Sequence, residues 1–207
     1  MNKRGTIAQG GKSAWQRFFH DRRGVAAVEF AILVPVLFCM YFLTMEAGQA
    51  IETDKKIGRV GSMVADLITQ QQSGKPMTKE DLTAIMRIGT AIVQPYNRSN
   101  PEVIVTAIQM SDSDTPEAKI AWSGQLVKDQ YSRPYAAETK VTVPEKLLTR
   151  NGFLIKVEAK LGYKPVIAWS ASEQKTLGFL SAFNELNMSE TYFLRPRQTN
   201  VIACSNC

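Results

Sequence analysis

The chain has 207 residues, which is enough for one modest globular domain together with a membrane anchor. A net charge of +6 and a pI near 9.3 would suggest a nucleic-acid-binding protein if the charge were spread along the chain. Residues 1–24, however, hold six of the 25 basic residues and only one of the 19 acidic residues. The rest of the chain has 19 basic and 18 acidic residues and is nearly neutral. Basic residues beside an apolar segment mark the side that stays in the cytoplasm. The excess charge therefore indicates topology, and we predict no nucleic-acid partner.

The first predicted element is an apolar segment over residues 25–45, interrupted only by Glu29. As a helix it would be about 31 Å long, which matches a bilayer core of about 30 Å. The basic flank predicts that residues 1–24 form a cytoplasmic leader. Residues 25–46 would cross the membrane, and the rest of the chain would lie on the far side.

The junction between leader and apolar segment reads Arg22-Arg23-Gly24-Val25-Ala26-Ala27-Val28-Glu29-Phe30. A carboxylate inside an apolar segment is expensive, because an ionised Asp at a helix centre costs about 2.5 to 3.5 kcal/mol on insertion scales. Glu29 is therefore a candidate functional residue. The alternative is an interfacial carboxylate that reaches the headgroups and does nothing more.

This junction resembles the processing site of type IVb prepilins and pseudopilins, which a prepilin peptidase cuts after the glycine. The pattern from Gly24 onward, with Pro35 soon after, is similar to the TadE-like pseudopilins of tight-adherence (Flp) pilus systems. The resemblance implies a mature chain that begins at Val25. Glu29 would be its fifth residue and would pair with the N-terminus of a neighbouring subunit. Phe30 would be the sixth, although ordinary lipid-facing bulk explains it as well.

The resemblance also implies a single-pass protein of the bacterial inner membrane, with its C-terminal domain in the periplasm. Its role would be structural, in pilus assembly, and not enzymatic. The implied partners are the prepilin peptidase, other pilins or pseudopilins, inner-membrane assembly components and the lipid bilayer.

The helical pattern continues beyond the apolar segment, with apolar residues at the three- and four-residue spacing of an amphipathic helix. These residues are Ile57, Val60, Val64, Leu67 and Ile68. We predict one helix over residues 25–70, with residues 47–72 as its amphipathic periplasmic extension. Gly58 and Gly61 weaken this helix by about 1 kcal/mol each, and close packing of a neighbour is a plausible reason for them.

A polar stretch, residues 70–76, is predicted to be a linker, and residues 77–207 a periplasmic domain. Thr78 is the predicted N-cap of a second helix that ends before Pro95. Beyond it, strands are predicted at residues 103–110, 119–126, 140–143, 153–162, 190–194 and 200–204, with 165–169 as a continuation after a bend.

Because the predicted strands lack intervening helices at α/β spacing, we expect an antiparallel sheet and the α+β class, in a pilin-like arrangement. Residues 153–165 also resemble the downstream strand of the TadE-like family, which carries a Glu, an aromatic residue and Pro. Residues 195–197, Arg-Pro-Arg, are predicted to form a bend between two edge strands, with a recognition loop as the alternative.

Three cysteines are present, and Cys39 in the apolar segment is expected to be a small buried side chain. Cys204 and Cys207 form a C-x-x-C. A periplasmic location favours a disulfide between them. A thioredoxin-like redox pair is disfavoured, because such a motif opens a helix within a βαβ unit. A zinc site is disfavoured as well, because zinc needs four N or S ligands. The one histidine, His20, lies in the leader.

The sequence offers no support for a catalytic site, a cofactor or a metal. Phosphate-binding, nucleophile-elbow and zinc-protease motifs are lacking. Asp112, Asp114 and Glu117 lack the regular spacing of a calcium loop, so we expect a solvated loop there.

Three other interpretations stay open. One is an uncleaved bitopic protein whose periplasmic domain binds a partner or ligand. Another is cleavage by signal peptidase after Ala50, which would release a domain beginning at Ile51. Against it, the apolar core exceeds the usual length of about 7 to 15 residues, and Glu46 interrupts the approach. The third, a membrane-tethered hydrolase, would need catalytic residues brought together only by folding.

Overall fold

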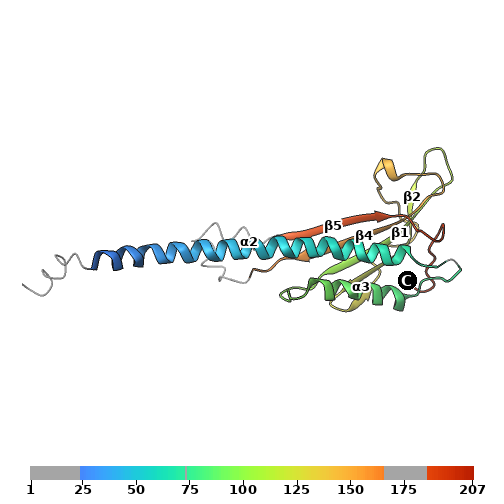
Figure 1. The fold of residues 1–207 in the computed structure, drawn as a ribbon. Helices are drawn as coiled ribbons and strands as arrows, with labels where there is room; N and C mark the ends of the chain where they lie inside the picture. The colour runs from blue at the N-terminus through green and yellow to red at the C-terminus, as the bar shows by residue number, and fades with distance from the viewer. Residues whose placement is uncertain (1–23, 73, 166–185) are drawn as a thin grey trace, which may run out of the picture. The chain divides into compact units, whose positions relative to one another are not determined.

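The structure, a computed structural model, describes residues 24–72, 74–165 and 186–207. The leader and the predicted strand residues 166–169 therefore lie outside the described residues. The described elements are helices α2 (Val25–Thr69) and α3 (Lys79–Val93), strands β1 (Glu102–Met110), β2 (Ala118–Val127) and β3 (Gln130–Ser132), the 3-10 turn η2 (Glu145–Leu147), and strands β4 (Phe153–Gly162) and β5 (Asn187–Leu194) (Figure 1). The chain divides into two compact units between Met45 and Glu46.

The first unit contains the apolar turns of α2. Helix α2 has 45 residues and contains Pro35, so the single long helix predicted from the sequence is confirmed to within one residue of its end. Its apolar side chains are exposed, with Phe30 and Ile32 each 66% exposed. Within the described ranges, α2 is the one helix long and apolar enough to cross a membrane.

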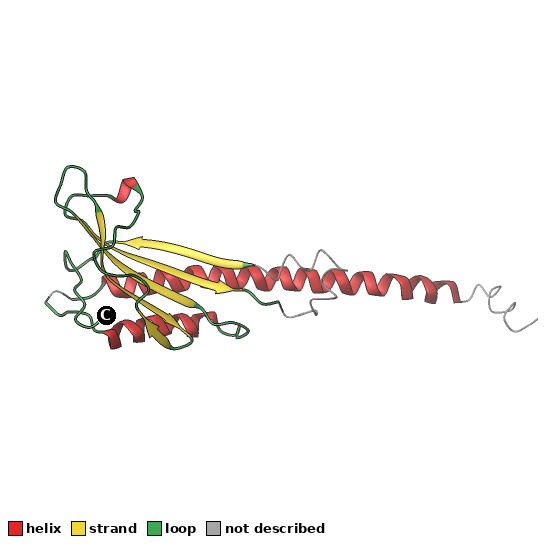
Figure 2. Cartoon of the chain, turned by 180° about the vertical axis from the view of Figure 1, so that it is seen from behind, coloured by secondary structure: helices red, strands yellow, loops and turns green. Residues whose placement is uncertain are grey.

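The second unit is built on a β-sheet, drawn in yellow in Figure 2. It has five strands in the order β3-β2-β1-β4-β5. Every pair of neighbouring strands is antiparallel. The predicted α+β class and antiparallel sheet are therefore confirmed.

One face of the sheet is covered by both helices, whose apolar residues join the sheet in a single core. Ile57, Val60 and Val64 of α2 are fully buried there, as the predicted stripe requires. Leu67, assigned to the same stripe, is instead 36% exposed. Buried and partly exposed residues alternate along β4. Its buried residues, among them Ile155, Val157 and Ala159, pack in the same core.

The two glycines of α2 lie against Tyr192 of β5. A Cβ added to Gly61 would lie 2.7 Å from Cδ2 of Tyr192, and one added to Gly58 would lie 3.2 Å from its hydroxyl oxygen. No ordinary side chain fits at Gly61 unless the ring moves. The close packing proposed for these glycines is therefore present.

Replacing Gly61 by valine is expected to lower the free energy of unfolding of the second unit by about 1 to 3 kcal/mol, because the added methyls overlap the Tyr192 ring. Urea unfolding of the full-length protein in detergent measures the change. Gly48→Val is the matched control, since a Cβ at Gly48 meets nothing within 4 Å and the cost of a β-branched residue in a helix is common to both. Equal loss in the two variants would contradict the packing explanation.

The start of α3 follows its sequence signal. Thr78 is the N-cap, and its side chain accepts a hydrogen bond from the backbone N–H of Asp81 at 3.1 Å. The Asp81 carboxylate accepts from the Thr78 backbone N–H in return, which completes a capping box. The helix ends at Val93, two residues before Pro95.

Two predicted strands are wrong. Residues 140–143 form only an isolated bridge between Lys140 and Lys119, because Val143 packs with Ile108 in a second apolar cluster instead of extending the ladder. Residues 200–204 likewise form one isolated bridge, from Cys204 to Met77.

Strand β3 was not predicted. It pairs with β2 across a turn in which Lys128 and Asp129 have positive φ angles, 49° and 60°. Asn-Gly or Asp-Gly is the usual signal for such a turn, and neither occurs at this position.

Candidate functional site

The residues of the predicted processing site lie at the start of α2. The helix begins at Val25, directly after Gly24. A Cβ added to Gly24 would meet nothing within 4 Å, so packing within the described chain does not require glycine there. Glu29 and Phe30 are both exposed on the first two turns. The four residues therefore form one accessible segment.

A polar cluster that the sequence did not reveal lies at the first turn of the second unit. Glu46, the residue after the apolar segment, is only 3% exposed. Its carboxylate accepts a short hydrogen bond from the hydroxyl of Tyr163, which lies just beyond β4. The Tyr163 ring is itself buried and stacks on Tyr96, with 5.5 Å between ring centroids.

Arg98 connects this cluster to the next turn of α2. Its guanidinium donates to the side-chain oxygen of Gln49 and to the backbone oxygen of Lys164, each at 2.7 Å. It also lies over the ring of Tyr96, 5.1 Å from the centroid. Glu46 and Gln49 are thus both held by residues far away in the sequence.

The environment of Tyr163 strongly favours its neutral form. Burial, reinforced by the hydrogen bond to the Glu46 carboxylate, raises the pKa of Tyr163 to about 12. The sequence showed each member of the Glu46–Tyr163 pair separately: Glu46 as an acid that ends an apolar run, and Tyr163 as the aromatic residue of the TadE-like strand pattern. Nothing in the sequence indicated that the two are in contact.

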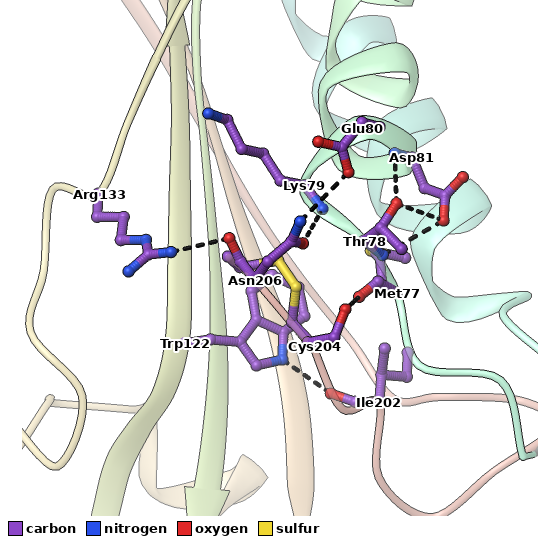
Figure 3. Close-up of a disulfide and its surroundings, with 12 residues drawn as sticks. Met77, Thr78, Lys79, Glu80, Asp81, Trp122, Arg133, Ile202, Cys204 and Asn206 are labelled. Carbon is purple, nitrogen blue, oxygen red and sulfur yellow. Dashed lines mark hydrogen bonds between the residues drawn. A yellow bond between two sulfur atoms is a disulfide. The ribbon is translucent and has the colours of Figure 1, made fainter.

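At the other end of the second unit, the structure joins Cys204 and Cys207 by a disulfide, with 5.7 Å between their Cα atoms (Figure 3). Cys39, for which we expected a buried position, is exposed on α2. It shares this exposure with its apolar neighbours Phe38 and Met40.

The acidic loop is paired with basic side chains. Arg150 contacts both Asp112 and Asp114, and Lys140 pairs with Glu117 at 2.7 Å. Across the described residues, no three His, Cys, Asp or Glu side chains are grouped in a way that could hold a metal ion.

The Arg-Pro-Arg segment does not form the predicted bend between two edge strands, since no further strand follows β5 in the described chain. Its second arginine instead closes the end of α2. The Arg197 backbone N–H donates to the oxygen of Thr69 at 3.0 Å, and its guanidinium pairs with Asp66 at 2.6 Å. Cations at a helix C-terminus are favoured by the helix dipole.

The geometry defines a class of protein: one exposed apolar helix suited to a membrane, continuous in sequence with a folded α+β unit. Residues 24–58 match the family model described as TadE-like protein. The resemblance predicted from the junction is therefore confirmed over that range. Comparisons with curated proteins and with solved structures gave no match. The family match and the candidate membrane helix together support a membrane protein related to the tight-adherence pilus.

Proposed function

We propose that this chain is a minor pseudopilin of tight-adherence pilus assembly, and that a prepilin peptidase cuts it after Gly24. The observation that carries the proposal is the family match, which begins at Gly24 and covers Glu29 five residues further along, on the exposed first turns of α2. The protein is inserted in the bacterial inner membrane with its leader in the cytoplasm and its α+β domain in the periplasm.

In this proposal the chemistry of cleavage belongs to the peptidase, and this chain is the substrate. The bond to be cut must leave the helical path to enter an active site, and glycine imposes the least resistance to that change. Its lack of a side chain also leaves the active site unobstructed. The open surroundings of Gly24 support this explanation, because they leave the glycine without a packing role in the described chain.

Cleavage would remove the six basic residues and one acid of the leader and leave an ammonium on Val25 at the edge of the bilayer. Glu29 then supplies the opposite charge for the ammonium of a neighbouring subunit. An unpaired charge at low dielectric is costly, so this pairing sets the axial register of assembly. The proposed partners are thus the peptidase, other pilins or pseudopilins, and inner-membrane assembly components.

The decisive experiment determines the mature N-terminus in cells with and without the peptidase, by mass spectrometry of the purified protein. We expect Val25 when the peptidase is present and Met1 when it is absent. Gly24→Val should block the conversion, because a β-branched residue cannot reproduce the fit of glycine in the active site. Gly48→Val, at another open position of α2, should be processed normally.

Each other outcome identifies a competing function. Met1 in every strain would indicate an uncleaved bitopic protein with a binding domain, and Ile51 would indicate a domain released by signal peptidase. Either result would overturn the pseudopilin proposal.

A further inference from the structure

The last residues of the chain are fastened to the segment that precedes α3 (Figure 3). The backbone N–H of Met77 donates to the oxygen of Ala203 at 2.8 Å, and the N–H of Ser205 donates to the oxygen of Met77 at 3.0 Å. The indole N–H of Trp122 on β2 donates to the oxygen of Ile202, also at 2.8 Å. The bonds to Ala203 and Ile202 hold the tail before its first cysteine, whereas the Ser205 bond holds the first residue after that cysteine.

The disulfide closes a ring of four residues, 204–207, which includes Ser205. Asn206, also inside the ring, makes three contacts. Its side-chain oxygen accepts from the backbone N–H of Lys79 at 2.6 Å, and its side-chain nitrogen donates to Glu80 at 3.3 Å. Its backbone oxygen accepts from the guanidinium of Arg133 at 2.8 Å. The ring thus lies against the first turn of α3.

The first turn of a helix has N–H groups without partners inside the helix. In α3 the Thr78 side chain satisfies the N–H of Asp81, three residues further along. It does not reach the N–H of Lys79, the first residue of the helix, and that group donates to Asn206 instead. Helix α3 therefore has two caps: one encoded locally at Thr78 and one delivered by the C-terminal ring.

We propose that the Cys204–Cys207 ring is a redox-operated latch that places Asn206 on the N-terminus of α3. A disulfide that closes so short a loop restricts the unfolded chain little, so its effect is expected to be local. Both cysteines pack against the main core, and the closed ring fixes the position of Asn206 between them. When the ring opens, Asn206 leaves α3, whereas the bonds of Ile202 and Ala203 remain.

Closing the latch is a thiol–disulfide exchange. The thiols of Cys204 and Cys207 lose two protons and two electrons, and one S–S bond forms between them. The electrons pass to the disulfide of a thiol oxidoreductase or a small-molecule disulfide, which becomes the dithiol. In a reducing compartment α3 therefore has only its Thr78 cap, and it gains the second cap after the domain enters an oxidising one. That cellular consequence rests on the proposed periplasmic location, but the latch itself does not.

Amide hydrogen exchange tests the latch in full-length protein purified in detergent, with and without a phosphine reductant. Reduction should speed the exchange of the Lys79 amide roughly five- to tenfold, as expected for loss of one helix cap. Asn206→Ala should produce the same acceleration while oxidised, with no further change at Lys79 on reduction. The Cys204→Ser, Cys207→Ser double variant should match reduced wild type.

The Met77 amide and the Trp122 indole N–H are the internal controls, because both are bonded outside the ring. We expect their exchange to stay within about twofold of the oxidised protein. Unchanged exchange at Lys79 on reduction would overturn the proposal, as would full protection of Lys79 in oxidised Asn206→Ala. Equal acceleration at Lys79, Met77 and Trp122 would show release of the whole tail and also overturn it. Since these readouts do not involve the peptidase or the membrane, failure here leaves the proposed function intact.

Discussion

Replacing Glu29 by alanine is expected to leave cleavage after Gly24 largely intact and to remove the protein from assembled pilus complexes. The peptidase reads the glycine and the basic flank, and neither is changed. Assembly instead loses the counter-charge for the ammonium of a neighbouring subunit. Pairing of a buried charge contributes up to several kcal/mol at low dielectric, and water at the bilayer edge reduces this figure.

The measurement is a fractionation that scores three quantities in parallel: the cleaved protein, its co-purification with pilus components, and piliation of the cells. Glu52→Ala is the matched control, because Glu52 is an exposed acid of the same helix whose partner, Lys56, lies one turn away. Its loss should change none of the three quantities. The free energy of unfolding of the second unit should be unchanged in Glu29→Ala, since Glu29 lies outside that unit.

Normal pili with normal incorporation of the Glu29→Ala protein would mean that this carboxylate is an interfacial residue without a role in assembly. If cleavage itself failed, the carboxylate would belong to peptidase recognition instead. Both results would contradict the mechanism proposed for Glu29, although the first would leave the processing site at Gly24 standing.

The parts of the fold that could be predicted from the sequence are those set by local periodicity. Residues 153–162 alternate in hydrophobicity, and β4 has these bounds with its apolar face in the core. Helix α3 begins at the capping box that Thr78 and its acidic neighbours encode. In each case the pattern and the burial have the same period, so local sequence is enough.

Prediction failed where tertiary contacts decide the outcome. Residues 140–143 have strand-like composition, but Val143 packs in an apolar cluster that includes Leu154 of β4. The tail joins Met77, which is more than a hundred residues earlier in the chain, through contacts that no local pattern encodes. Strand β3 depends on two residues in the left-handed region that are neither glycine nor asparagine.

The candidate site shows the same division. Gly24 and Glu29 could be named as candidates from the sequence, because their spacing within one short segment carries the signal, and the family match covers both. The Glu46–Tyr163 pair could not, because its two members are 117 residues apart and each has an ordinary explanation alone. The burial of the Glu46 carboxylate can be recognised only in the folded chain, where the end of β4 places the Tyr163 hydroxyl beside it.

Replacing Tyr163 by phenylalanine is expected to lower the free energy of unfolding of the second unit by about 1 to 3 kcal/mol at pH 7. The ring and its stacking on Tyr96 are retained, so the loss reports the hydroxyl that donates to the buried Glu46 carboxylate. Urea unfolding of the full-length protein in detergent measures the loss. Tyr131→Phe is the matched control, because the Tyr131 hydroxyl is buried without a hydrogen-bond partner among the described residues. Its removal should be neutral or slightly stabilising.

Alkaline pH gives the same pair a second test, and the sign follows from linkage. The pKa of Tyr163 is raised to about 12 in the folded protein, whereas an unfolded tyrosine titrates near 10. Folding therefore favours the neutral phenol. That contribution is fully present below about pH 10 and is lost as the pH rises toward 12, at about 1.4 kcal/mol for each pKa unit.

Wild type should thus lose more stability over this range than Tyr163→Phe. Burial also raises the pKa of Tyr131. Because Tyr131 is present in both proteins, its contribution cancels in the difference between their stabilities. Parallel stability curves from pH 9 to 12 would show that the Tyr163 hydroxyl is not held in its neutral form by Glu46 and its buried surroundings.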